Sequence, residues 1–425
     1  MRLDSFLTLL KKTTRLPISY NINLESNIIQ LIEKMISNSD EFKSFHVKIY
    51  NQVKNYSSEN KMASKLTCRV AAALALMSAG SAQALEGAWT HYGVRPLGMG
   101  NAFVAVSDDF NALFYNPAGL ARLDDWYLEI LNPSVGASSA TVSIVKEITD
   151  LGKSGAGFAK TLDFVEKHVG ETHHVGVGWT PYFIKKSFGI GIGMDVGFSL
   201  EAHSDLDIHL NLGSEVMVPI SYAKNFLDDR LSLGLTAKVY AGFEADENLS
   251  IDTINSLSGD SSSKLKDLAK GGKGVGFDAG LLFTPIKTMA PTLGVMVADI
   301  GDTRLAPLND TLGKQDARPM AVNLGMSLKP IETGSQYVLL AIDTHQVNQP
   351  THFSHKLNLG AEWGLGRILK LETGLSDGQF TAGTQIDVKL LKFRFATYAI
   401  DHGAVAGTND RLIDRRYLLQ IKLLI

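Results

Sequence analysis

The chain has 425 residues, a formal net charge of −3, 45% apolar residues, 20% charged residues and 39 glycines. It contains no run of about 18 apolar residues, which argues against a helical membrane protein. It also has no basic patch interleaved with aromatic residues, so we expect no nucleic-acid partner. A mean hydropathy of +0.04 is typical of chains in which lipid-facing and lumen-facing residues cancel along membrane-spanning strands.

An export signal is predicted inside the chain. Residues 62–84 combine positive charges, a short apolar run and a small-residue cleavage site, which is the pattern of a secretory signal peptide. We therefore expect Met62 to be the true start and residues 1–61 to be an upstream extension of the reading frame; a cytosolic helical appendage is the alternative. The single cysteine, Cys68, lies in the part that would be removed. The signal features are Lys65, Arg69, Val70 to Met77 and Ala82-Gln83-Ala84.

Residues 85–125 form a block rich in glycine, asparagine and aspartate, without sustained alternation, whereas residues 126–425 alternate apolar and polar residues over most of their length. The clearest stretch runs from Ser187 to Leu200, with apolar residues at every second position. A strand that crosses a bilayer needs roughly 9–11 residues, so this stretch predicts a membrane-spanning strand with one lipid-facing side. Small lumen-facing residues are expected at Gly189, Gly191 and Gly193.

A second alternating stretch runs from Leu231 to Phe243. Lys238 lies in the middle of its polar row. An unpaired charge that faces hydrocarbon is costly, so we expect this row to face water or a polar lumen. Lipid would then lie outside the fold and polar groups inside it.

Sixteen segments of residues 126–425 show strand-like alternation. Because neighbouring segments can belong to one strand and bacterial barrels have even strand numbers, we predict an all-β fold, a transmembrane antiparallel β-barrel of about 14 strands. A last strand near the carboxyl end would pair with the first and remove the open edge, which lipid cannot satisfy. The segments are 126–133, 135–145, 173–183, 187–201, 205–212, 214–226, 230–244, 274–285, 291–299, 319–329, 335–345, 353–365, 367–375, 380–390, 391–401 and 413–425.

The connections between these segments are of unequal length. Long polar connections are expected at 146–172, 246–272 and 301–318, and tight turns separate several of the other neighbours. Short turns at one rim and long loops at the other are typical of outer-membrane barrels.

The block before the barrel resembles the amino-terminal signature of the FadL-like outer-membrane proteins. Between Arg95 and Asp109 it contains Gly-Met-Gly and then Ser-Asp-Asp, and Ala112-Leu113-Phe114-Tyr115 is followed by Asn-Pro-Ala-Gly at 116–119. The PorV-like branch, which serves type IX secretion, is similar over the same block. The resemblance covers residues 93–425 and is sharpest in its first thirty or so.

The resemblance implies a fourteen-stranded barrel with an amino-terminal hatch, in the outer membrane of a Gram-negative bacterium, and hydrophobic substrates such as fatty acids. Glycines in such a hatch permit tight turns and close backbone approach, and an asparagine before proline favours extended or turn geometry. A turn-rich cap without a gating role is the equally open alternative. Position by position, the resemblance places Gly98, Gly100, Asn116, Pro117, Ala118 and Gly119 in the plug.

Several polar pairs invite a catalytic or metal-binding interpretation. Adjacent residues, and residues at i and i+3, point to opposite faces of a strand, so the histidine pairs are expected to be solvated rim residues, and we expect no metal and no cofactor. An aspartate and a histidine at i and i+2 share a face, but the sequence cannot place a serine beside them, so we predict no catalytic residue and no enzymatic activity. The pairs are His173 and His174, His352 and His355, and Asp343 and His345.

Two function classes follow. The first is passive uptake of long-chain fatty acids or other hydrophobic compounds through an apolar lumen pocket and a side opening near the plug. The second is a PorV-like structural role, in which long loops dock exported or envelope proteins. Membrane lipid is a partner in both, and a soluble periplasmic β-sandwich is a third interpretation of the alternation. An apolar cavity favours uptake, whereas a filled interior with large ordered loops favours docking.

Overall fold

The computed structural model describes part of the chain. The expected extension 1–61, the expected signal 62–84 and the start of the block 85–125 lie outside the described residues. In the part that is described, no helix is both long and apolar enough to cross a bilayer. The described residues are 93–142, 167–202, 208–249, 269–350, 353–388, 391–404 and 411–423.

Strands dominate these residues, with a few short helices. The helices are α5 (Val94–Gly98), η1 (Phe110–Leu113), η2 (Pro117–Arg122) and α10 (Phe353–Lys356). The strands are β1 (Tyr127–Glu129), β2 (Pro133–Ser138), β3 (Thr172–Trp179), β4 (Tyr182–Lys185), β5 (Phe188–Gly191), β6 (Gly193–Ala202), β7 (Ile208–Phe226), β8 (Leu231–Leu249), β9 (Lys270–Phe283), β10 (Thr292–Ala298), β11 (Ala306–Pro307), β12 (Gly313–Lys314), β13 (Ala321–Glu332), β14 (Gln336–Thr344), β15 (Leu357–Leu365), β16 (Leu369–Ser376), β17 (Gln379–Val388), β18 (Leu391–Ala404) and β19 (Arg411–Leu423).

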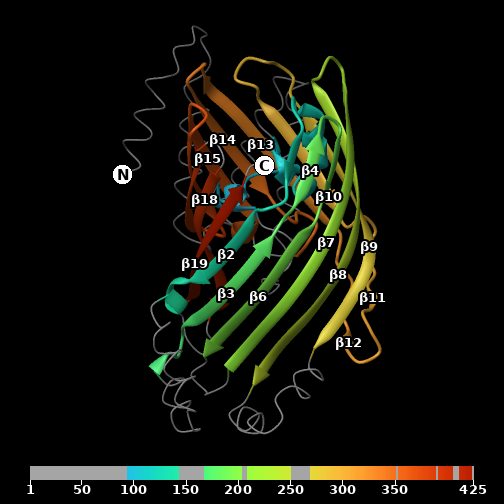
Figure 1. The fold of residues 1–425 in the computed structure, drawn as a ribbon, viewed down its shortest axis with the longest axis vertical. Coiled ribbons are helices and arrows are strands. Elements are labelled where there is room, and N and C mark those ends of the chain that lie inside the picture. Colours follow the sequence, from blue (N-terminus) through green and yellow to red (C-terminus); the bar gives the residue numbers. More distant parts are fainter. Residues whose placement is uncertain are drawn as a thin grey trace, which may run out of the picture. The chain divides into compact units, whose positions relative to one another are not determined.

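The strands close into a 14-strand antiparallel barrel (Figure 1), as the sequence predicted. Closure comes from β19, which pairs with β18 on one side and with β2 on the other. No ring strand therefore presents an unpaired edge, which is the condition for a sheet surrounded by lipid. The ring order is β2, β3, β6, β7, β8, β9, β10, β13, β14, β15, β16, β17, β18 and β19.

The sixteen predicted segments reduce to this ring because neighbours merge in two places. The segments 205–212 and 214–226 are one strand, β7, and the segments 126–133 and 135–145 become β1 and β2, which occupy one position of the wall. The stretch 187–201 was expected to be continuous, and this is wrong in detail. It breaks at Ile192 into β5 and β6, because the Ile192 amide donates to the carbonyl of Pro181 instead of joining the ladder.

The same break runs across three adjacent positions of the wall. The break separates β1 from β2, β3 from β4, and β5 from β6 by at most a few residues. Beyond the break, the strand pairing continues through β1, β4 and β5. In place of backbone bonds, the Asn132 side-chain amide donates to the Thr180 carbonyl and its Oδ1 accepts from the Thr180 amide at 3.0 Å. Pro181 follows directly and cannot donate to a ladder.

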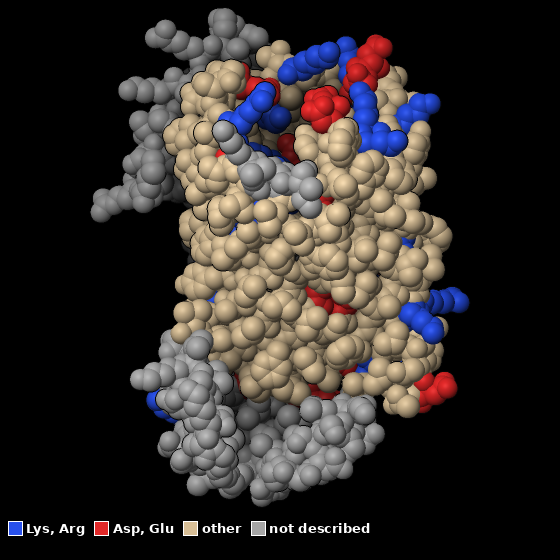
Figure 2. Space-filling model, viewed as in Figure 1, with Lys and Arg blue, Asp and Glu red and all other residues tan. Residues whose placement is uncertain are grey.

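Apolar side chains cover the outer face of the strands. On β3 the exposed residues are Val175, Val177 and Trp179, which alternate with half-buried inner residues. On β8 Leu233, Leu235 and Val239 are exposed in the same way. Figure 2 shows charged side chains gathered at the upper end of this face and a mostly uncharged wall below them. An exterior of this kind fits a hydrocarbon surround and does not fit the soluble sandwich.

Residues on the inner face point to the lumen, as expected for Lys238 and the glycine row. Lys238 is buried, with its ammonium 2.8 Å from Asp278 and 3.1 Å from Asp299. Gly189 and Gly191 face Leu113, which lies inside the barrel. The lysine therefore meets a pair of buried carboxylates rather than bulk water.

Candidate functional site

Residues 93–123, called here the inner segment, lie inside the barrel and are almost entirely buried. Their apolar side chains form a core with the wall, which includes Phe103, Phe110, Leu113 and Tyr115. Phe110 stacks on Tyr182 of β4, with ring centroids 4.5 Å apart and planes 4° from parallel. The lumen is therefore filled at this level by a packed segment.

A buried ion pair fastens the inner segment to the wall. The Arg95 guanidinium donates to both carboxylate oxygens of Glu362 on β15, at 2.5 and 2.9 Å. A further nitrogen of Arg95 donates to Asp108 at 2.6 Å and to Asp109 at 3.1 Å. Burial alone would lower the pKa of Arg95, but these three carboxylates raise it well above its usual value. Arg95 is thus a permanent cation at the centre of a carboxylate cluster.

Asp109 belongs to the same cluster and is the N-cap residue of η1. Its carboxylate accepts from the Asn111 backbone amide at 2.9 Å, which satisfies a free donor of the first turn. Burial would raise the pKa of Asp109, but attraction from Arg95 and Arg394 outweighs it and lowers that pKa to about 2.

Asp343 of β14 holds the backbone of the inner segment directly. One of its carboxylate oxygens accepts from the amides of Phe103 and Val104, at 2.6 and 2.7 Å. His345 lies 3.5 Å away from the same oxygen, so the two residues share a face as expected. The carboxylate is engaged by two amides, and its position is that of an anchor for the chain inside the barrel.

The Asn-Pro-Ala-Gly motif lies at the start of η2. The Asn116 side chain donates to the carbonyls of Val104, at 2.8 Å, and Leu281, at 3.2 Å, and accepts from the Ala118 amide at 3.2 Å. The Asn116 side chain therefore both caps η2 and bonds it to the barrel wall. Pro117 occupies the first turn, where its missing N–H costs nothing.

Close backbone contacts surround the predicted glycines. Gly100 has φ of +62°, a left-handed conformation that favours glycine. A Cβ on Gly98 would lie 3.0 Å from the Cα of Gly383, and a Cβ on Gly119 would collide with the carbonyl of Ser107. These residues are close to the wall or to the rest of the inner segment because they lack a side chain.

The wall contributes a matching row of glycines, which the sequence analysis did not single out. A Cβ on Gly374 would lie 2.5 Å from the amide nitrogen of Gly100, and one on Gly294 would lie 2.8 Å from the Cα of Ala105. Distances below 3.0 Å are essentially never seen for a real Cβ. The row, called here the glycine belt, consists of Gly234, Gly280, Gly294, Gly325, Gly360, Gly374 and Gly383.

Beside the inner segment lies a cavity of about 700 Å³. Leu97 and Asn101 of the inner segment line it, together with inner-face residues of the strands. It reaches the end of β8 that leads into a long connection, at Asp246, and the neighbouring end of β7, at His209. Its size is within the usual range for small-molecule sites, roughly 300–1,000 Å³.

Polar and apolar surface share the lining of this cavity about equally, so the described residues do not form the purely apolar lumen pocket that was expected. Alternation fixes that these side chains face inward but not which of them meet, and the lining combines inner positions from strands far apart in sequence. Leu97, Phe243 and Tyr398 contribute to the apolar part of the lining. The carboxylates are Asp195, Glu215, Glu244, Asp246, Asp377 and Asp401, the cations are Lys356 and Arg416, and the histidines are His174, His209, His345, His355 and His402.

His173 and His174 point to opposite faces of β3, as their spacing predicted, but the expectation of a solvated rim residue is wrong for His173, which is buried. His174 faces the cavity and bonds the Ser199 hydroxyl at 2.8 Å, whereas His173 lies on the other face of β3. His355 bonds Asp377 across the cavity lining. His352 lies outside the described residues.

Inner side chains of β19 lead from the cavity to the break in the wall. Arg416 lines the cavity, and Leu418 packs on the cluster that contains Leu97. Further along, Gln420 donates to the carbonyl of Asn132 at 3.2 Å. Lys422 ends the row, buried, with its ammonium 2.7 Å from Glu129. The inner face of β19 thus runs from the cavity, at Arg416, to Asn132 at the break.

No family model matches the sequence, and no curated protein matches it either. Among solved structures, the chain is similar to the CymD monoaromatic hydrocarbon channel, with 11% identity, coverage of 81% of this chain and 99% of that chain, and a TM-score of 0.49. For a ΔS2S3 mutant of the TodX monoaromatic hydrocarbon channel the values are 11%, 79%, 99% and 0.49. For a Pseudomonas aeruginosa FadL homologue they are 11%, 79%, 99% and 0.43.

The architecture is of the type that the FadL-like signature implied. The described residues form a closed 14-strand barrel, and an amino-terminal stretch is packed inside it. The exterior is apolar and the connections are unequal in length, as in β-barrels of the outer membrane.

Proposed function

We propose that this chain is an outer-membrane channel of FadL type for the passive uptake of hydrophobic compounds, with long-chain fatty acids as one class. The observation that carries the proposal is the inner segment, which blocks a closed barrel beside a cavity of ligand size. Passive passage needs a binding surface and a route, and no catalytic group. On this proposal residues 62–84 direct export in a Gram-negative bacterium, and the inner segment, including Gly98, Gly100, Asn116, Pro117, Ala118 and Gly119, acts as the plug.

The route of passage runs sideways rather than straight through the inner segment. Arg95, Asp343 and Asn116 fasten that segment with buried bonds, and their loss would leave several polar groups unpaired. At the break in the wall side-chain bonds replace the ladder, since Asn132 bonds the Thr180 backbone twice and Gln420 donates to the Asn132 carbonyl. A compound in the cavity would move along Leu418 to this break and leave into the bilayer.

The cavity lining narrows the substrate class. Six acidic side chains and two cations line it, so acidic groups outnumber fixed cations at its surface. A free carboxylate would be repelled there except beside Arg416 or Lys356. Among hydrophobic compounds we therefore favour those whose polar group is neutral or cationic over free fatty acids.

Uptake of fluorescent hydrophobic probes by a deletion strain complemented with variants tests the proposal. Gly136 faces Leu418, whose Cδ1 would lie 3.3 Å from an added Cβ, so Gly136→Leu fills the route. Val135 is exposed on the outer face of the same strand, which makes Val135→Leu a matched control. We expect a several-fold loss of uptake in the first variant and none in the second. Unchanged uptake in the deletion strain would overturn the function, and unchanged uptake in Gly136→Leu would overturn the route.

A PorV-like docking role is the second candidate, favoured by one observation. The long connection 299–320 is ordered and folds back on β9, where β11 pairs with Lys273 and β12 with Lys270. An ordered external surface can hold a protein partner. Replacing residues 306–314 by a short Gly-Ser linker, which keeps the buried Leu305 and the cavity-lining Gln315, separates the two roles. Uptake retained with loss of exported proteins from the cell surface would support docking, and the reverse would support transport.

A further inference from the structure

Two histidines and a glutamate meet at the start of β3, outside the cavity described above. His168 and Glu171 belong to the turn before the strand, and His173 is its second residue. Both histidines are buried, although His173 is on the strand face that further along carries the exposed Val175. The turn before β3 therefore covers His173, which places three potential ligands together.

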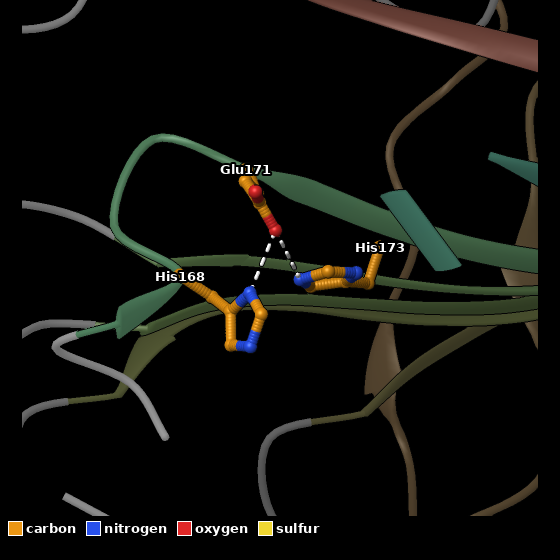
Figure 3. A group of neighbouring side chains, drawn as sticks. All are labelled: His168, Glu171 and His173. Carbon is orange, nitrogen blue, oxygen red and sulfur yellow. Dashed lines mark hydrogen bonds and ion pairs between the residues drawn. The ribbon is translucent and has the colours of Figure 1, made fainter. Parts of the chain in front are cut away.

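The geometry of the group is compact. One oxygen of the Glu171 carboxylate lies 2.8 Å from Nδ1 of His168 and 3.5 Å from Nε2 of His173. Figure 3 shows this oxygen directed at a nitrogen of each ring. The two imidazoles meet edge to face, with ring centroids 5.5 Å apart and planes at 82°. All three ligand atoms lie within 4.8 Å of one another.

These distances fit a metal ion after small side-chain rotations. With metal–ligand bonds of about 2.0–2.1 Å in a tetrahedral site, ligand atoms lie about 3.3 Å apart. The two histidine–glutamate distances of 2.8 and 3.5 Å lie on either side of that value. Binding would lengthen the contact between His168 and Glu171 and bring all three ligand atoms, now within 4.8 Å of one another, to this spacing.

We propose that His168, Glu171 and His173 form a binding site for a single divalent transition-metal ion of the zinc class. Two imidazoles with one carboxylate are a ligand set that zinc uses when it keeps a further position for water. Imidazole nitrogen selects zinc, copper and nickel, whereas magnesium and calcium prefer oxygen ligands. The bound ion would fasten the connection that precedes β3 to the first residues of the strand.

Access for the ion and its water comes from a second cavity. It has a volume of about 350 Å³, and Glu171 lines it together with Gly170 and Asp414. Asp414 is bonded to Arg416 at 2.6 Å, so we do not count it as a ligand.

Zinc binding by the purified full chain in detergent tests the site. After removal of metal with a chelator, equilibrium dialysis against Zn²⁺ gives the stoichiometry and affinity of wild type, His173→Gln and Glu171→Gln. His174→Gln is the matched control, because it is the adjacent histidine on the opposite face and lines the cavity. We expect one tight zinc per chain, weakened by at least about 100-fold in the two ligand variants, since even the loss of a supporting residue around a metal site costs about 10–100-fold. The control should bind as wild type does.

A Co²⁺ titration provides a second readout of the same variants. Cobalt in a four- or five-coordinate site of nitrogen and oxygen ligands gives visible absorption bands, which scattered surface binding does not reproduce. His168→Gln should remove these bands, and excess Mg²⁺ or Ca²⁺ should leave them unchanged. Equal weakening in His173→Gln and His174→Gln, or tight binding that survives in all three ligand variants, would overturn the proposal.

Discussion

Arg95 and Glu362 are 267 residues apart in the sequence, yet the guanidinium of one and the carboxylate of the other form two hydrogen bonds, of 2.5 and 2.9 Å, inside the barrel. Both side chains are almost completely buried. A planar guanidinium matches a carboxylate with two parallel bonds, which fixes orientation as well as distance. This pair therefore sets where the inner segment lies against β15.

Arg95→Met should release the inner segment. It leaves the Glu362 carboxylate buried without its cation, which costs about 3–5 kcal/mol. We expect a lower free energy of unfolding in detergent micelles and larger ion conductance in planar bilayers. The double variant Arg95→Met/Glu362→Met should recover part of the loss, because the buried Glu362 charge is removed with its partner while Asp108 and Asp109 still lose Arg95. Asp108→Asn is the control, since Asp108 is 39% exposed and such pairs contribute about 0–1 kcal/mol.

Enlarging one residue of the glycine belt should displace the inner segment. In Gly374→Ala the new Cβ would lie 2.5 Å from the backbone of Gly100, which cannot move like a flexible side chain. Overpacking of this kind costs about 1–3 kcal/mol. Protease sensitivity of the inner segment and chemical unfolding measure the effect. Gly334→Ala is the matched control, because nothing lies within 4 Å of its added Cβ, and an equal effect in both variants would contradict the argument.

Asn132→Ala should open the break in the wall. Its side chain makes two bonds to the Thr180 backbone where the backbone ladder is interrupted, and alanine removes both of them. If the break is the exit route, uptake of hydrophobic probes should rise, with a loss of stability of about 1–3 kcal/mol. Asn225→Ala provides a comparison, since this side chain also bonds backbone, at Ala121, but away from the break. Uptake that rises equally in both variants would contradict a specific exit.

Acid should weaken the packing of the inner segment through Asp109. Its pKa is about 2 in the folded protein, below the usual 3.8, so it stabilises the fold above pH 3.8 and this contribution disappears as the pH falls toward 2. The contribution is about 2 kcal/mol. Chemical unfolding at a series of acidic pH values should therefore show a steeper decline for wild type than for Asp109→Asn. Asp124→Asn, at an exposed position, should follow wild type.

The two sets of contacts around the inner segment differ in how far the sequence could reveal them. Asn116 and the glycines near it stand in a local motif, so their place inside the barrel could be expected from a family resemblance. Glu362 and Gly374 lie in strands whose alternation looks ordinary. Only the closure of the ring brings those two residues opposite Arg95 and Gly100.

The cavity shows the same limit. Period-two alternation identified the inner face of each strand because a side chain that faces lipid must be apolar and its neighbours need not be. It could not show that six acidic side chains and five histidines from several strands and their connections would line one cavity. It also gave no indication of a partner for His173, because strand periodicity does not encode the conformation of the turn at His168 and Glu171.

The sequence by itself determined the all-β class, the lipid-facing and inner faces, and a strand number of about 14, because a bilayer imposes its polarity on every strand separately. The tertiary structure alone decided how the lumen is filled, where the wall is interrupted, and which distant charges meet. Those features depend on the register between neighbouring strands and on the closure of the ring, which are fixed only when all the strands pair with one another.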